Sequence, residues 1–170
     1  MLVIFAKLDL AAKDAAWIEA VRRRHDPQAG LVAAHFTLVF PFEGLEAAEV
    51  LPHARLVAAS TVPIGFRLAS ALAVRDQLAP RSHVFLTPDA GAADIVALHD
   101  RLYEGPLARF LRHDLPYTPH VTVAAMAAHG DTETLARELA PIDLRGRMAA
   151  LTLASLGDGV LSQVWELPLG

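Results

Sequence analysis

Two segments of this 170-residue chain repeat one four-residue pattern, and both have the apolar character of a buried β-strand. His35-Phe-Thr-Leu38 lies in the run 31–40, and His120-Val-Thr-Val123 lies in the run 119–125. Side chains alternate across a strand, so the His and Thr of each tetrad project from one face while their apolar neighbours point into the packing. A buried polar group needs a partner. Two strands that each carry a His and a Thr on one face therefore predict a common site.

The order of the predicted elements repeats as well. Hydrophobic periodicity predicts strands over 2–8, 31–40, 63–74, 82–87, 119–125, 147–156 and 160–167, and helices over 11–24, 46–59, 92–103 and 131–140. We expect Asp9 and Asp131 to cap the first and last of these helices, and Pro52 to bend or split the second. Phe5 and Leu86 are expected to match in the two first strands.

These patterns predict an α+β fold in which a strand–helix–strand–helix–strand unit is duplicated within a single bilobal domain, 1–170. Lobe one covers about 1–76, lobe two about 81–157, and a final strand about 160–167. Each lobe is expected to be an antiparallel sheet with helices on its outer face. A pseudo-two-fold axis would then bring both tetrads to opposite walls of a central groove.

Composition narrows the range of partners. The net charge of −4 argues against broad binding of duplex DNA, whereas a small nucleotide or an RNA terminus can use a local positive pocket. The run Arg22-Arg-Arg24 is expected to be a solvated helix end. The chain has no cysteine, its apolar runs fall far short of the ~20 residues of a membrane span, and its first residues do not resemble a signal peptide. These features favour a cytoplasmic protein; the oligomeric state is left open.

Two rival chemistries can be weighed from the residues. A His-Glu-x-x-His motif is absent and no carboxylate adjoins either tetrad, although a two-histidine metal site completed from elsewhere stays open. The chain has no Gly-x-Ser-x-Gly motif of the kind that positions a nucleophilic serine. Of the other six histidines, five are expected to have ordinary surface or capping roles, and His83 is left open.

The paired tetrads, 85 positions apart, resemble the two-histidine (2H) phosphoesterase superfamily, and most closely its 2′-5′ RNA ligase-like proteins. Phe-Pro-Phe (40–42) after the first tetrad and Tyr117-Thr-Pro-His120 before the second add to the likeness. The resemblance covers the whole chain in element order, but its specificity rests on the two tetrads. It implies hydrolysis or transfer at a 2′,3′-cyclic or 2′-5′ phosphodiester.

The residue chemistry agrees with that implication. His35 and His120 can serve as general base and general acid, in either order, and no metal or cofactor is expected. Thr37 and Thr122 can donate hydrogen bonds to the non-bridging phosphate oxygens. Tyr117 and Arg81 are candidate substrate contacts, with Arg75 as a neighbour of Arg81. The alternative is a binding module that holds a nucleotide or an RNA end in the same groove without chemistry.

Overall fold

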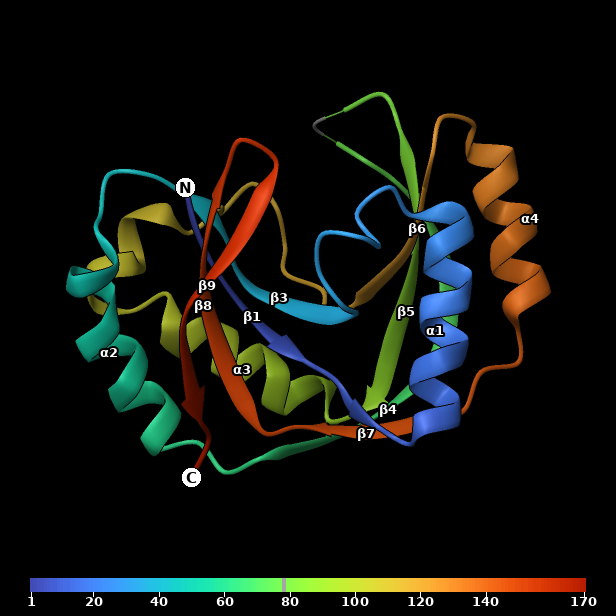
Figure 1. The fold of residues 1–170 in the computed structure, drawn as a ribbon. Coiled ribbons are helices and arrows are strands. Elements are labelled where there is room, and N and C mark those ends of the chain that lie inside the picture. Colours follow the sequence, from blue (N-terminus) through green and yellow to red (C-terminus); the bar gives the residue numbers. More distant parts are fainter. Residues whose placement is uncertain (78) are drawn as a thin grey trace.

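The computed structural model describes residues 1–77 and 79–170, and Figure 1 shows how its elements are arranged. Their order is β1 Leu2–Lys7, β2 Asp9–Leu10, α1 Ala12–His25, β3 His35–Phe42, α2 Ala47–Ala59, β4 Ile64–Arg75, β5 Ser82–Ala90, α3 Ala92–Leu102, the 3-10 helix η1 Gly105–Phe110, β6 Val121–Met126, α4 His129–Leu139, β7 Leu144–Met148, β8 Ala150–Gly157 and β9 Val160–Pro168.

The strands form two antiparallel sheets. Sheet A has the strand order β3-β1-β8-β9, and sheet B has the order β2-β7-β4-β5-β6. Helices α2 and α3 pack beside sheet A, and α1 and α4 pack beside sheet B, which gives the molecule its two halves in Figure 1. The predicted α+β class, with paired antiparallel sheets and outer helices, is confirmed.

The third strand of each sequence half lies in the sheet of the other half. Strand β4 pairs with β5, and β8 pairs with β1, so β3-β1-β8 in sheet A corresponds to β6-β5-β4 in sheet B. The predicted division into lobes of about 1–76 and 81–157 is therefore wrong at these strands. The connection between β4 and β5 is only a few residues long, and strands joined so closely become antiparallel neighbours.

The strand register also corrects the match between the two halves. Phe5 on β1 lies opposite Thr37 of the first tetrad, and Phe85 on β5 lies opposite Thr122 of the second. Phe5 thus corresponds to Phe85 and not to Leu86. A shift of one residue would turn every side chain to the opposite face of the sheet.

The apolar residues of the two tetrad strands lie in the core, as predicted from their alternation. Phe36 and Leu38 on β3, and Val121 and Val123 on β6, are at most 1% exposed. Each packs with the apolar faces of the surrounding helices and strands in one hydrophobic cluster. The opposite faces of the same strands are then available for the polar residues of the tetrads.

Two predicted helix caps are not formed. Asp9 lies in the short strand β2 and accepts a hydrogen bond from Arg147 Nε at 2.7 Å, while α1 begins after Ala11 without a side-chain cap. Asp131 is the third residue of α4, which begins at His129. Sequence periodicity places helix ends poorly because the choice of cap depends on the partners that the fold brings near.

Helix α2 runs through Pro52 as a single element, so the predicted split is wrong. A capping box secures its first turn: the Glu46 and Glu49 side chains each accept a hydrogen bond from the other's backbone N–H. Among the described residues, no helix is long and apolar enough to cross a bilayer.

Candidate active site

The two tetrads lie at corresponding ends of the edge strands β3 and β6. His35 is the first residue of β3, and His120 directly precedes β6. These two strands approach each other where sheet A meets sheet B, as Figure 1 shows. The exchange of third strands leaves β3 and β6 at the sheet edges, and so places the tetrads at the junction of the two sheets.

Both imidazoles are held in the same way. Nδ1 of His35 is 2.8 Å from the carbonyl oxygen of Ala33, and Nδ1 of His120 is 2.6 Å from that of Thr118. A carbonyl oxygen only accepts, so the proton of each neutral ring sits on Nδ1 and the lone pair sits on Nε2. Each ring therefore presents Nε2 as the nitrogen that can exchange a proton with a substrate.

An aromatic ring supports each imidazole from the neighbouring strand. The ring centroids of Phe5 and His35 are 4.9 Å apart, and those of Phe85 and His120 are 3.7 Å apart with the planes nearly parallel. Phe5 and Phe85 are equivalent in the two halves, because each lies opposite the tetrad threonine. Phe5 precedes His35 by 30 residues and Phe85 precedes His120 by 35, so spacing alone does not reveal this match.

The surroundings of both histidines lower their pKa values. Burial lowers the pKa of His35, and the Arg22 guanidinium acts in the same direction, while the hydrogen bond to Ala33 and the carboxylates of Asp26 and Glu19 act in the opposite one. Burial also lowers the pKa of His120 to about 4, with smaller contributions from the imidazoles of His83 and His35. The influence of His35 on His120 means that the two rings are near enough to affect each other's charge.

A buried ion network on α1 holds the chain just before His35. Arg22, which is 1% exposed, pairs with Asp26 and Glu19 at 3.0 Å each. Glu19 Oε1 also accepts the backbone N–H of Ala34 at 2.7 Å. The prediction of a solvated arginine run is therefore wrong for Arg22. The spacing of residues 19, 22 and 26 along one helix face was the available signal.

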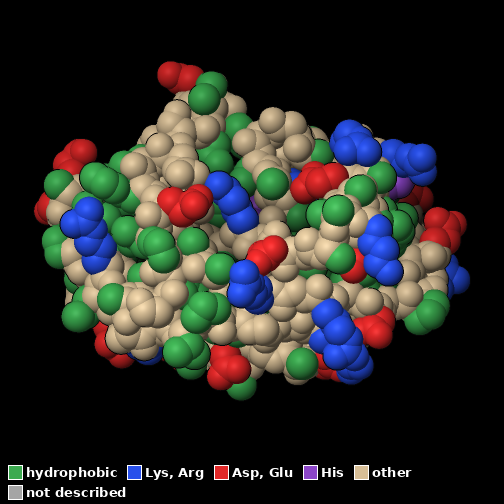
Figure 2. Space-filling view, turned by 60° about the horizontal axis from the view of Figure 1, so that its bottom comes forward, with side chains coloured by type: hydrophobic (Ala, Val, Ile, Leu, Met, Phe, Trp, Pro, Cys, Tyr) green, Lys and Arg blue, Asp and Glu red, His purple; other side chains and the backbone are tan. Residues whose placement is uncertain are grey.

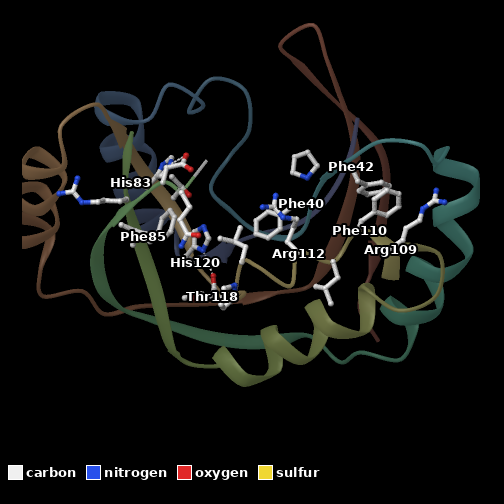
Figure 3. A pocket seen from close by; sticks show the side chains of 18 residues that line it. Phe40, Phe42, His83, Phe85, Arg109, Phe110, Arg112, Thr118 and His120 are labelled. Atoms are coloured by element: carbon white, nitrogen blue, oxygen red, sulfur yellow. Dashed lines mark hydrogen bonds and ion pairs between the residues drawn. The ribbon is translucent and has the colours of Figure 1, made fainter. Parts of the chain in front are cut away.

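A cavity of about 800 Å³ lies beside the second tetrad. Figure 3 shows the side chains that line it. His120, Thr122, Phe85 and His83 line one end of it. His35 and Thr37 are not among the described residues that line it. The cavity therefore reaches the second tetrad directly, while the first lies across the junction of the two sheets.

The side chain of Tyr117 joins the two tetrad segments. Its hydroxyl donates a hydrogen bond to the carbonyl oxygen of Thr37 at 3.0 Å, and its ring stacks on His99 at 3.7 Å. Burial raises the pKa of this hydroxyl. Tyr117 thereby ties the segment before His120 to the strand that carries His35.

The two arginines named from the sequence, Arg75 at the end of β4 and Arg81 just before β5, differ in position. Arg75 lines the cavity, whereas the exposed Arg81 is not among its described lining residues and lies 3.9 Å from Asp76. His83, left open from the sequence, places Nε2 3.1 Å from Asp76 and stacks on Phe85. The Nδ1 atom of His83 is buried without a hydrogen-bond partner among the described residues. Among all the residues that the structure describes, no three His, Cys, Asp or Glu side chains gather as metal ligands do.

Comparison with known proteins gives a consistent family. The family model described as "2'-5' RNA ligase superfamily" matches residues 10–159. A Bacillus pumilus protein named "Putative phosphoesterase" is 37% identical over 105 residues, which are 61% of this chain and 58% of that protein. A Bacillus licheniformis protein of the same description is 29% identical over 61% of this chain and 59% of its own length. The chain spans about three fifths of the length of these curated relatives.

Solved structures share the fold along almost the whole chain. The Thermus thermophilus protein TT0787 superposes with a TM-score of 0.68 at 20% identity, covering 99% of this chain and 98% of that one. Escherichia coli LigT in apo form gives 0.57 at 23% identity, covering 98% and 96%. Kluyveromyces marxianus Usb1 gives 0.61 at 13% identity, covering 99% and 97%.

Proposed function

Because the chain belongs to the 2′-5′ RNA ligase superfamily, we propose that it hydrolyses a 2′,3′-cyclic or 2′-5′ phosphodiester by acid–base catalysis with His35 and His120. The observation that carries the proposal is the matched anchoring of the two imidazoles. Each ring is fixed through Nδ1 to a backbone carbonyl oxygen two residues earlier, which presents Nε2 for proton transfer.

In-line attack at phosphorus requires one proton acceptor and one proton donor. We assign the base to His120, because its pKa of about 4 keeps it neutral over most of the pH range. His120 Nε2 takes a proton from water as the new P–O bond forms. We assign the acid to His35. Burial and Arg22 lower its pKa, whereas the Ala33 carbonyl oxygen and the carboxylates of Asp26 and Glu19 favour its charged form. His35 gives its Nε2 proton to the leaving ribose oxygen as the old P–O bond breaks. The product is a phosphomonoester.

The tetrad threonines complete the proposed site. The hydroxyls of Thr37 and Thr122 donate hydrogen bonds to the non-bridging oxygens, where negative charge rises in the transition state. The negative phosphate raises the pKa of both imidazoles when it binds, which lets the acid carry its proton near neutral pH. The two imidazoles supply both proton transfers, so the proposed mechanism uses no metal.

Nucleotides are the proposed substrate class. Escherichia coli LigT, which shares this fold at 20% identity, has been solved in complex with 3'-AMP. The same protein has been solved with ATP. We extend the class to this chain because an apolar cavity with aromatic walls adjoins His120.

The experiment measures conversion of 2′,3′-cyclic AMP to the monophosphate by phosphorus NMR, with and without a chelator. We expect turnover that the chelator leaves unchanged, and a loss of about 10²–10⁴-fold in His35→Ala and His120→Ala. His25→Ala, at the end of α1, is the control and keeps its activity. Nucleotide binding without turnover would instead identify a binding module, and activity restored only by added metal would refute the mechanism.

The assignment of base and acid has a separate test. A 4-nitrophenyl phosphodiester has a leaving group that needs no proton. With this substrate, the activity of His35→Ala should approach that of the wild type, because the leaving group no longer needs the acid. The activity of His120→Ala should stay low. The opposite result would exchange the two roles.

A further inference from the structure

A β-bulge directly follows the threonine of each tetrad. On β3 the pairing with β1 slips by one residue between Thr37 and Val39, which leaves Leu38 as an extra residue. On β6 the pairing with β5 slips in the same way just after Thr122, which leaves Val123 as the extra residue. The fourth residue of each tetrad is therefore the bulged one. A bulge bends its strand and changes the direction of neighbouring side chains, which is why bulges are common beside active sites.

Two tyrosine hydroxyls bond to the backbone of β3 on either side of its bulge. That of Tyr117 donates to the carbonyl oxygen of Thr37 at 3.0 Å, and that of Tyr103 accepts the N–H of Phe40 at 3.0 Å. Strand β3 lies at the edge of sheet A, and the bulge interrupts its ladder. Side chains, and not a neighbouring strand, thus satisfy these two backbone groups.

His99 on α3 contacts both tyrosines and bonds to the bulged residue itself. Its Nδ1 is 2.8 Å from the carbonyl oxygen of Leu38, which only accepts, so this nitrogen carries the proton. The ring stacks on Tyr117 with the planes 2° apart, and it lies tilted against Tyr103 with the centroids 4.8 Å apart. His99 is 2% exposed, so the surface or capping role expected of it from the sequence is wrong.

The ring cluster of His99, Tyr103 and Tyr117 is polar without containing a Lys, Arg, Asp or Glu side chain. Such charged side chains are interspersed over the surface shown in Figure 2. His99 and Tyr103, by contrast, are at most 4% exposed. Hydrogen bonds made inside a protein rigidify the structure around them and specify one arrangement of it. The ring cluster therefore fixes β3 at its bulge against α3 and against the segment that leads to β6.

We propose that His99 is a positioning residue of the active site: by holding the bulge of β3, it keeps the first tetrad aligned with His120. The side chain acts through the β3 backbone and through Tyr117, and it does not touch the substrate. Without the hydrogen bond at Leu38 the bulge relaxes, and a displacement of about 1 Å at the reacting groups costs about 10²-fold in rate. This inference rests on the proposed function and adds a residue to its machinery.

The test measures kcat and KM for 2′,3′-cyclic AMP in variants that circular dichroism shows to be folded. His99→Leu removes the donor and should lower kcat about 10- to 100-fold, while KM changes less than about threefold, because alignment is lost and binding is not. His99→Asn places an amide N–H near the position of Nδ1, so its kcat should be about tenfold above that of His99→Leu. His99→Phe keeps a ring against Tyr117 without the hydrogen bond, and it replaces His99→Leu if that variant does not fold.

Two outcomes of these assays would overturn the inference. One is a kcat within about threefold of the wild type in the variant that lacks the donor, since a misaligned pair of tetrads loses more than this. The other is an equal loss of kcat in His99→Asn, since the hydrogen bond to Leu38 would then not be what positions the tetrad.

His53→Leu is a matched control. The half-buried His53 also donates a ring N–H to a backbone carbonyl oxygen, because its Nε2 is 3.1 Å from the oxygen of Leu102. This bond joins α2 to the end of α3 and lies outside the tetrads. The kcat of His53→Leu should stay within about threefold of the wild type. A loss as large as that in His99→Leu would show a general loosening of α3 and refute a specific role for His99.

An NMR measurement separates this inference from the proposed function. If the wild-type protein turns over no phosphodiester, the proposed function fails, and the imidazole signals of His35 then decide the inference. The His35 ring lies against Phe5, so ring currents make its signals sensitive to small displacements. His99→Leu should shift these signals, and His53→Leu should leave them in place. Unchanged His35 signals in His99→Leu would refute the positioning role.

Discussion

Replacing Arg22 by methionine tests whether a buried ion network supports the first tetrad. The side chains of Arg22 and Asp26 are 2% and 4% exposed, and their nitrogen and oxygen atoms are 3.0 Å apart. The substitution fills most of the volume but leaves the Asp26 carboxylate buried, with the Gln28 backbone N–H at 2.9 Å as its remaining donor among the described residues. Removing one partner of a buried pair costs about 3–5 kcal/mol.

The assay is urea unfolding near pH 7.5, followed by circular dichroism. Arg22→Met should lower the free energy of unfolding by about 3–5 kcal/mol. Arg23→Met, at an exposed position of the same helix, should change it by less than about 0.5 kcal/mol. Adding Asp26→Asn to Arg22→Met should recover part of the loss, because the amide keeps a hydrogen bond from Gln28 without the buried charge. A cost below about 1 kcal/mol in Arg22→Met would refute this description of the network.

Three further results are expected. The double variant His35→Ala/His120→Ala should be little worse than either single variant, because residues that act as one unit are not additive; multiplied losses in a rate assay would contradict this. The pKa values of both histidines are lowered, that of His120 to about 4. A pH–rate profile of kcat/KM should therefore peak between about pH 4 and 6.5, falling above as the acid loses its proton and below as the base gains one; a peak above pH 8 would be inconsistent. Tyr117→Phe removes the hydrogen bond to the carbonyl oxygen of Thr37. It should lower the free energy of unfolding in urea by about 1 kcal/mol and should also lower kcat. An unchanged kcat would show that this hydrogen bond does not align the tetrads.

Local sequence patterns were sufficient for the elements and for the tetrads. Alternation along 35–38 and 120–123 places Phe36, Leu38, Val121 and Val123 in the core, as observed. Periodicity also identified the helices, most clearly α3 and α4, whose amphipathic spacing is stronger than that of α1 and α2. These signals depend on residues a few positions apart, which is the range over which a single sequence is informative.

The pairing of strands and the surroundings of the histidines depend on the tertiary fold. Strands β4 and β8 could pair within their own halves by pattern alone, and it is the short β4–β5 connection that decides otherwise. The backbone carbonyl oxygens of Ala33 and Thr118 carry no sequence signature at all, since every residue has one. The far end of the cavity is likewise formed by β3 and η1, which are distant in sequence.

The central proposal is that one phosphate lies between His35 and His120. A crystal structure of the protein with 3′-AMP measures this directly. Two hydrogen bonds of about 3 Å and the breadth of one phosphate predict Nε2 atoms roughly 5–8 Å apart, each bonded to a different oxygen of the same phosphate. A phosphate bound to one histidine alone, with the Nε2 atoms more than about 12 Å apart, would contradict a shared acid–base site.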